Sequence, residues 1–81
     1  MEEYWLSERS RAAWSLRETE QKIAQCNEDL LAYMRGGLEK EALKEQERLG
    51  ALMRQRECYI NAYRDADGEV TRAAWFRLTG I

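Results

Sequence analysis

The 81-residue chain contains no proline and no histidine, and each absence excludes something. Without proline, nothing in the chain forbids long uninterrupted helices, because proline is the residue that breaks them most strongly. Without histidine, the chain lacks the commonest acid–base catalyst and the commonest metal ligand. The remaining residues form no nucleophile–base arrangement and no metal-ligand spacing. We therefore expect no enzyme, and we expect no metal, cofactor or small-molecule substrate.

Long apolar runs and an excess of one charge are also missing. No apolar stretch approaches the ~20 residues that a membrane-spanning helix needs. The sequence starts with Met1-Glu2-Glu3, which is acidic and does not resemble a signal peptide, so we expect a cytoplasmic protein with no membrane partner. Thirteen basic and 15 acidic residues give a net charge of −2, which provides no overall attraction to nucleic acid.

The cysteines are few, and their spacing does not favour a disulfide. Cys26 and Cys58 fall on different predicted helices. In an antiparallel hairpin, Cys26 lies about 16 Å along the helix from the position that faces Cys58. A disulfide needs Cα atoms closer than ~7 Å. We therefore expect two free thiols, with Cys26 as a small core residue.

A pair of glycines, Gly36 and Gly37, separates two long charged stretches. Glycine readily adopts the left-handed conformation that ends a helix, so Gly36 suits the position just past a helix end. Gly37 can then cap the next helix. The pattern predicts an antiparallel hairpin with a first helix over about 3–35, a turn at 36–37 and a second helix over about 38–66.

Both predicted helices carry an apolar stripe with the seven-residue repeat of a coiled coil. In the first helix the stripe consists of two lines, Leu16-Ile23-Leu30 and Trp5-Ala12-Thr19-Cys26-Tyr33. In the second helix it contains Leu38, Ala42, Leu49, Leu52, Met53, Tyr59, Ile60 and Tyr63. Arg56 interrupts this second stripe. Its head either pairs with Glu20 across the hairpin or extends to water.

The stretch Asp65-Ala66-Asp67-Gly68 resembles a helix break. Asp67 suits the cap of a short third helix over about 69–78, which is apolar nearly all round. The segment Thr79-Gly80-Ile81 is expected to fray. The predicted fold is a single all-α domain, residues 1–81: a coiled-coil-like antiparallel hairpin with a short C-terminal third helix.

Most aromatic residues fall at the open end of the hairpin, which is the end opposite the turn. Trp14 stands on a polar face and needs a cover, either the third helix folding back or another protein. Trp, Tyr and Arg dominate protein-binding hot spots. The candidate partner-binding residues are Trp5, Trp14, Trp75, Phe76, Arg11 and Arg72.

These features predict a small protein–protein interaction module of adaptor, chaperone or inhibitor type. Its partner is another protein or a second copy, for example in a homodimeric four-helix bundle. The alternative is a nucleic-acid-binding regulator that uses the arginine-rich third of the hairpin. That third contains Arg9, Arg11, Arg17, Arg54, Arg56 and Arg64. The acidic residues between these arginines make nucleic acid the less favoured partner.

Overall fold

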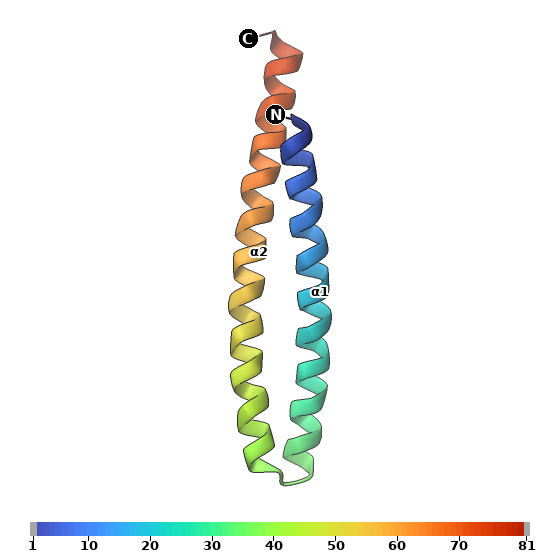
Figure 1. The fold of residues 1–81 in the computed structure, drawn as a ribbon, viewed down its shortest axis with the longest axis vertical. Helices are drawn as coiled ribbons and strands as arrows, with labels where there is room; N and C mark the ends of the chain where they lie inside the picture. Colours follow the sequence, from blue (N-terminus) through green and yellow to red (C-terminus); the bar gives the residue numbers. More distant parts are fainter. Residues whose placement is uncertain (1, 81) are drawn as a thin grey trace.

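The computed structural model describes residues 2–80, and its fold is an α-helical hairpin (Figure 1). Helix α1 spans Glu2–Arg35 and helix α2 spans Glu39–Thr79. The two helices lie side by side in opposite directions and give a rod of 64 × 15 × 14 Å. The all-α hairpin predicted from the sequence is confirmed. Ile81, part of the predicted frayed end, lies outside the described residues, while Thr79 is the last helical residue and Gly80 caps α2.

The turn is a Schellman motif that is built on Gly37. The Leu38 N–H donates to the Tyr33 carbonyl (2.9 Å) and the Gly37 N–H donates to the Met34 carbonyl (3.2 Å). Gly37 has a φ of 71°, the left-handed conformation that this motif requires. These bonds satisfy carbonyls at the end of α1 and reverse the chain within three residues.

The turn lies at the predicted residues 36–37, but the left-handed residue that ends α1 is Gly37, one residue later than the sequence predicts. The Gly36 N–H still donates to the Ala32 carbonyl at 3.0 Å, so Gly36 continues the helical bonding instead of reversing the chain. Gly37 takes the left-handed position, and Leu38 takes the N-cap position of α2 without a side-chain cap bond. The expectation that Gly37 caps α2 is wrong, because the left-handed conformation of Gly37 ends α1 and Leu38 takes the N-cap position.

The helices pack along a seam of residues at heptad positions a and d, and this seam buries mostly small side chains. On α1 the buried seam residues are Ala12, Thr19 and Cys26, and on α2 they are Leu52 and Ala66. Thr19 satisfies its hydroxyl within α1 by donating to the Ser15 carbonyl at 2.8 Å. The core role predicted for Cys26 is confirmed, because its exposed fraction is 0%.

Two ion pairs between the helices define the register of the hairpin. Arg9 Nη1 lies 2.9 Å from Asp67 Oδ1, and Arg56 Nε lies 3.5 Å from Glu20 Oε1. The Arg56–Glu20 pairing that the sequence suggested is present, and the Arg56 head also remains partly exposed. In this register Trp14 lies at the level of Ala62, and Glu3 lies at the level of Ala73.

The predicted break at residues 65–68 and the separate third helix are wrong. Within the described residues the chain stays helical from Glu39 to Thr79. Ala66, at the centre of the expected break, is 2% exposed and packs in the seam. Asp67 pairs with Arg9 on α1 instead of capping a new helix. A single glycine, here Gly68, lowers helix stability by only ~1 kcal/mol, which seam packing offsets.

Because α2 is longer than α1, its C-terminal end extends past the N-terminal end of α1 (Figure 1). We call residues 75–79 the overhang, since the register places them beyond the level of Glu2. Gly80 closes the overhang with a φ of 72° and an N–H bond of 3.0 Å to the Phe76 carbonyl. No residue of α1 is available to cover this last part of α2.

Candidate interaction surface

A groove lies between the helices toward the open end, and we call it the open-end groove. Trp5, Arg11 and Ala12 line it from α1, and Tyr59 and Ala66 line it from α2, together with Glu8, Ser15, Ala62 and Asp65. Its volume is about 400 Å³. The groove exists because Ala12 and Ala66 fill little of the space between the helices, while larger side chains stand along its edges.

Two of the six predicted partner-binding residues, Trp5 and Arg11, meet in this groove. Trp5 is half-buried, and its ring lies against that of Tyr4 in an edge-on arrangement with centroids 5.0 Å apart. Arg11 is mostly exposed and pairs with Glu8 one turn earlier, at 3.2 Å. An apolar floor with a charged rim is typical of protein-binding surfaces.

The structure does not bring Trp14 and Trp75 together. Each occupies heptad position f, the position furthest from the other helix, so they lie on opposite edges of the hairpin. They are also about 20 Å apart along the rod, from the 1.5 Å rise per residue. Trp14 is 60% exposed and Trp75 is 63% exposed. The cover expected for Trp14 from a third helix is absent, because α2 continues straight past it.

The other predicted residues, Phe76 and Arg72, lie on the last two turns of α2. Phe76 is exposed on the overhang beside Leu78, which is 82% exposed. Arg72 is largely exposed and pairs with Glu69 at 3.0 Å. The open end thus presents aromatic side chains on several faces, not one flat patch. Their role in binding a partner stays a prediction.

The two broad faces of the hairpin differ in polarity, a property that the sequence analysis missed. Residues at heptad position e lie on one face, which we call the apolar face, and six of these eleven helical residues are apolar: Leu6, Ala13 and Met34 on α1, and Met53, Ile60 and Ala74 on α2. Residues at position g lie on the other face, which we call the charged face, and six of these ten helical residues are charged: Glu8, Lys22, Asp29, Glu41, Arg48 and Glu69. The remaining four are Ser15, Gln55, Ala62 and Phe76. The signal was available from the heptad positions flanking the seam.

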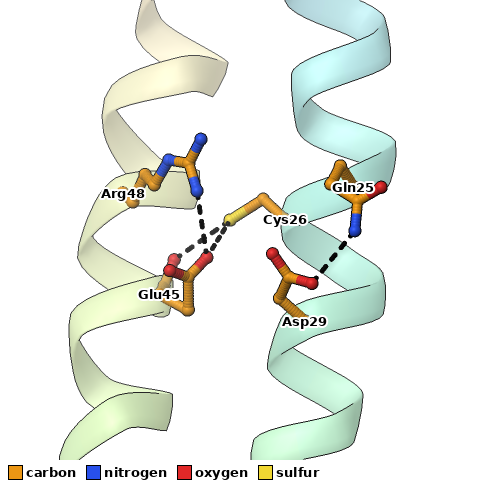
Figure 2. Close-up of polar contacts among 5 residues, drawn as sticks. All are labelled: Gln25, Cys26, Asp29, Glu45 and Arg48. Carbon is orange, nitrogen blue, oxygen red and sulfur yellow. Dashed lines mark hydrogen bonds and ion pairs between the residues drawn. The ribbon is translucent and has the colours of Figure 1, made fainter.

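The turn-proximal half of the seam contains a polar cluster (Figure 2). The Cys26 thiol donates to the Glu45 backbone carbonyl at 3.3 Å and to Glu45 Oε2 at 3.1 Å. Arg48 Nη1 lies 3.6 Å from the same carboxylate oxygen. The Glu45 side chain is only 15% exposed, so these contacts supply partners for a largely buried carboxylate.

This environment makes Cys26 a poor nucleophile. Burial raises the pKa of the Cys26 thiol, and its hydrogen bond to Glu45 and the negative charge of that residue raise the pKa further. A thiolate is the reactive form of cysteine, and the site disfavours it. Cys58 is free and exposed on α2. Among the residues that the structure describes, no cluster of three or more histidine, cysteine or acidic side chains could hold a metal ion.

Half of the arginines in the arginine-rich third of the hairpin lie in ion pairs, while Arg17, Arg54 and Arg64 lie in none among the described residues. Arg9, Arg11 and Arg56 each lie within 4 Å of a carboxylate, those of Asp67, Glu8 and Glu20 respectively. A paired guanidinium is less available to a phosphate, since the two anions compete for the same donors. The ion pairs therefore leave only part of this arginine cluster free for phosphate contacts, and the nucleic-acid alternative stays a prediction.

In the described part of the chain, neither helix is apolar over a stretch long enough to cross a lipid bilayer. Comparison with protein-family models, with curated proteins and with solved structures finds no match to this chain.

Proposed function

We propose that this chain is a non-enzymatic protein–protein interaction module of adaptor, chaperone or inhibitor type. It buries its aromatic open end on a partner protein or within its own oligomer. The contacting residues are the six predicted ones: Trp5, Trp14, Trp75, Phe76, Arg11 and Arg72.

The observation that carries the proposal is the large surface relative to the small core. The hairpin exposes 6370 Å², whereas a compact protein of 9.6 kDa exposes about 5,100 Å². Its buried apolar residues, within the described chain, are Ala12, Cys26, Leu52 and Ala66. Much larger side chains, such as Trp14 and Trp75, stay in solvent. Extended exposed apolar surface of this kind marks sites of protein association.

The open end is the favoured part of that surface because its side chains have the composition of a binding hot spot. Trp14, Trp75 and Phe76 are exposed, and burying one such aromatic contributes on the order of 2–3 kcal/mol. Arg11 and Arg72 stand beside them with largely exposed heads. Their ion pairs lie within one helix, so both arginines can exchange partners at an interface.

The test compares Trp14→Ala with a matched control, Gln21→Ala. Both residues are exposed, and both occupy position f of α1, one heptad apart. The wild-type chain is used as bait in cells or extract, a co-purifying protein is identified by mass spectrometry, and the purified pair is titrated by calorimetry. Trp14→Ala, and separately Phe76→Ala, should weaken binding by at least tenfold, or about 1.4 kcal/mol. Gln21→Ala should leave it unchanged.

Denaturant unfolding of each variant separates binding from folding. If Trp14→Ala lowers the stability of the isolated hairpin but leaves the affinity of the folded fraction intact, the open end is not the binding surface. If instead nucleic acid co-purifies, and its affinity falls steeply with added salt, the arginine-based alternative replaces the proposal.

A further inference from the structure

No element of the described hairpin packs against the apolar face. Along it, Leu6, Met34, Met53 and Tyr63 are exposed, and the seam residues Leu16, Ile23, Leu30 and Leu49 are only half-buried. The charged face, by contrast, has Lys22, Glu41 and Arg48 exposed to water. A two-helix coiled coil with one apolar flank has the pattern of half a four-helix bundle.

Charged residues on the apolar face are mostly neutralised in place. Glu20 and Asp67 occupy position e, and each pairs with an arginine of the opposite helix, Arg56 and Arg9 respectively. The other polar residues at this position are Asn27, Glu39 and Gln46. At Glu20 and Asp67 such a face can therefore approach a copy of itself without opposing unpaired charges, whereas Arg17, which lies near the middle of the face, is in no ion pair among the described residues.

The grooves on this face are placed for an antiparallel copy. A middle groove of about 300 Å³ is lined by Ala13, Leu16, Arg17, Glu20 and Tyr63. Along the rod, this groove is centred near Tyr59, which is the midpoint of α2. A two-fold axis through this level would bring the groove against the same groove of a second copy, as an isologous contact requires.

The ends of the apolar face are complementary under the same axis. Two adjoining grooves of about 250 and 290 Å³ lie beside the turn. The side chains that line them include Met34, Leu38, Ala42 and Leu43. At the opposite end of the rod the overhang exposes Leu78. An antiparallel copy would place its overhang over these turn grooves.

We propose that two copies of this chain pack antiparallel through their apolar faces and form a four-helix bundle in which each overhang covers the turn grooves of the other copy. The area is sufficient for a stable dimer. The paired length of α1 is about 51 Å from its 1.5 Å rise per residue. With the 15 Å width of the rod, this gives about 750 Å² on each copy and about 1,500 Å² in total, the size of a standard specific interface.

This dimer goes beyond the open-end surface of the proposed function, because it uses a different face. The first test is analytical ultracentrifugation of the full chain over a range of concentrations. The expected species has twice the 9.6 kDa mass of one chain. A hairpin that stays monomeric at high micromolar concentration would overturn the proposal, and the open end could still bind another protein.

The second test places the interface with a matched pair of variants, Met53→Glu on the apolar face and Gln55→Glu on the charged face. Both residues are exposed, so neither change removes hairpin packing. Met53→Glu should raise the dimer dissociation constant by at least about 30-fold, since two copies of Met53 are lost from one interface. Gln55→Glu should change it less than about threefold. Equal effects would mean that the apolar face is not the interface.

The third test fixes the orientation by disulfide formation in a Cys58→Ser background. Met34→Cys and Leu78→Cys chains are mixed and oxidised. The antiparallel dimer joins a Met34→Cys chain to a Leu78→Cys chain. Bonds that form only between identical chains would show a parallel dimer and overturn the proposal. Because Met34 and Leu78 are both exposed, the hairpin fold tolerates these changes.

Discussion

Replacing Gly68 with alanine should stabilise the protein, and this change tests whether α2 is continuous. Gly68 lies inside α2 and does not have the positive φ that Gly37 and Gly80 have. A Cβ added at Gly68 meets no atom within 4 Å, so alanine brings neither a clash nor a new contact. The remaining effect is helix propensity, which favours alanine by ~1 kcal/mol in a helix interior. For a domain of this size, that corresponds to a melting temperature about 4–8 °C higher.

Gly37→Ala is the matched control, because a Cβ there also meets nothing within 4 Å. Gly37 has a φ of 71°, however, and a non-glycine residue is disfavoured in this left-handed conformation by about 1–2 kcal/mol. The two substitutions add the same methyl group in open space, so the opposite signs arise from backbone conformation alone.

The assay is urea unfolding followed by circular dichroism, with all proteins at one concentration because assembly also contributes to stability. Gly68→Ala should raise the midpoint, and Gly37→Ala should lower it. If residues 65–68 formed a turn between two helices, Gly68 would require a left-handed conformation and its replacement would destabilise. A loss of stability in Gly68→Ala similar to that in Gly37→Ala would therefore refute the continuous helix.

Two further substitutions probe the seam. The raised pKa of Cys26 adds a stabilisation that is complete below the pKa of an unfolded-chain thiol, about 8.5, and is lost as the pH rises toward the higher pKa of the folded state. The urea midpoint of the wild type should therefore fall more steeply above about pH 8.5 than that of Cys26→Ala, and parallel curves would contradict this. Asp67→Asn should lower stability by less than about 1 kcal/mol, because the Arg9–Asp67 pair is partly exposed. A double-mutant cycle with Arg9→Gln measures the coupling, and a value well above this limit would show that the pair is effectively buried.

The hairpin could be predicted from the sequence because its signals coincide. The glycine pair falls where both apolar stripes end, and the absence of proline leaves each helix unbroken. Which of the two glycines takes the left-handed conformation could not be predicted with equal precision. Either Gly36 or Gly37 can adopt that conformation, and the choice depends on where the last helical hydrogen bond of α1 forms.

The predicted break at residues 65–68 was wrong because it rested on turn-forming residues and did not consider their heptad positions. Asp65 occupies position c and Gly68 position f, both away from the seam, so neither interrupts packing. The seam itself continues through Ala66, Val70 and Ala73, which are buried or half-buried. Extending the heptad through this stretch would have predicted one long α2. Local turn propensity is a weak signal where long-range packing is maintained.

Residue type alone was also not enough to predict how the candidate site is arranged. Residue type pointed to Trp14 and Trp75, and both are exposed. Type alone could not show that the two residues stand on opposite edges of the rod, because that depends on their heptad positions and on α2 continuing through Trp75. The polarity difference between the apolar face and the charged face follows from heptad positions in the sequence, but it appears only when the e and g positions of both helices are compared.

The composition of the seam connects folding to assembly. An isolated helix in water is marginal, and most helical stability in proteins comes from packing an apolar face. Here the seam buries small side chains and includes polar Glu45 and Arg56, so the packing within one hairpin is modest. Larger seam side chains such as Leu16 and Ile23 are only half-buried, and further large apolar side chains are exposed on the apolar face and at the open end. We therefore expect that a partner or second copy covering these surfaces, as proposed, would add to the free energy that holds α2 helical through its overhang, and so would couple the order of the C-terminal turns to binding.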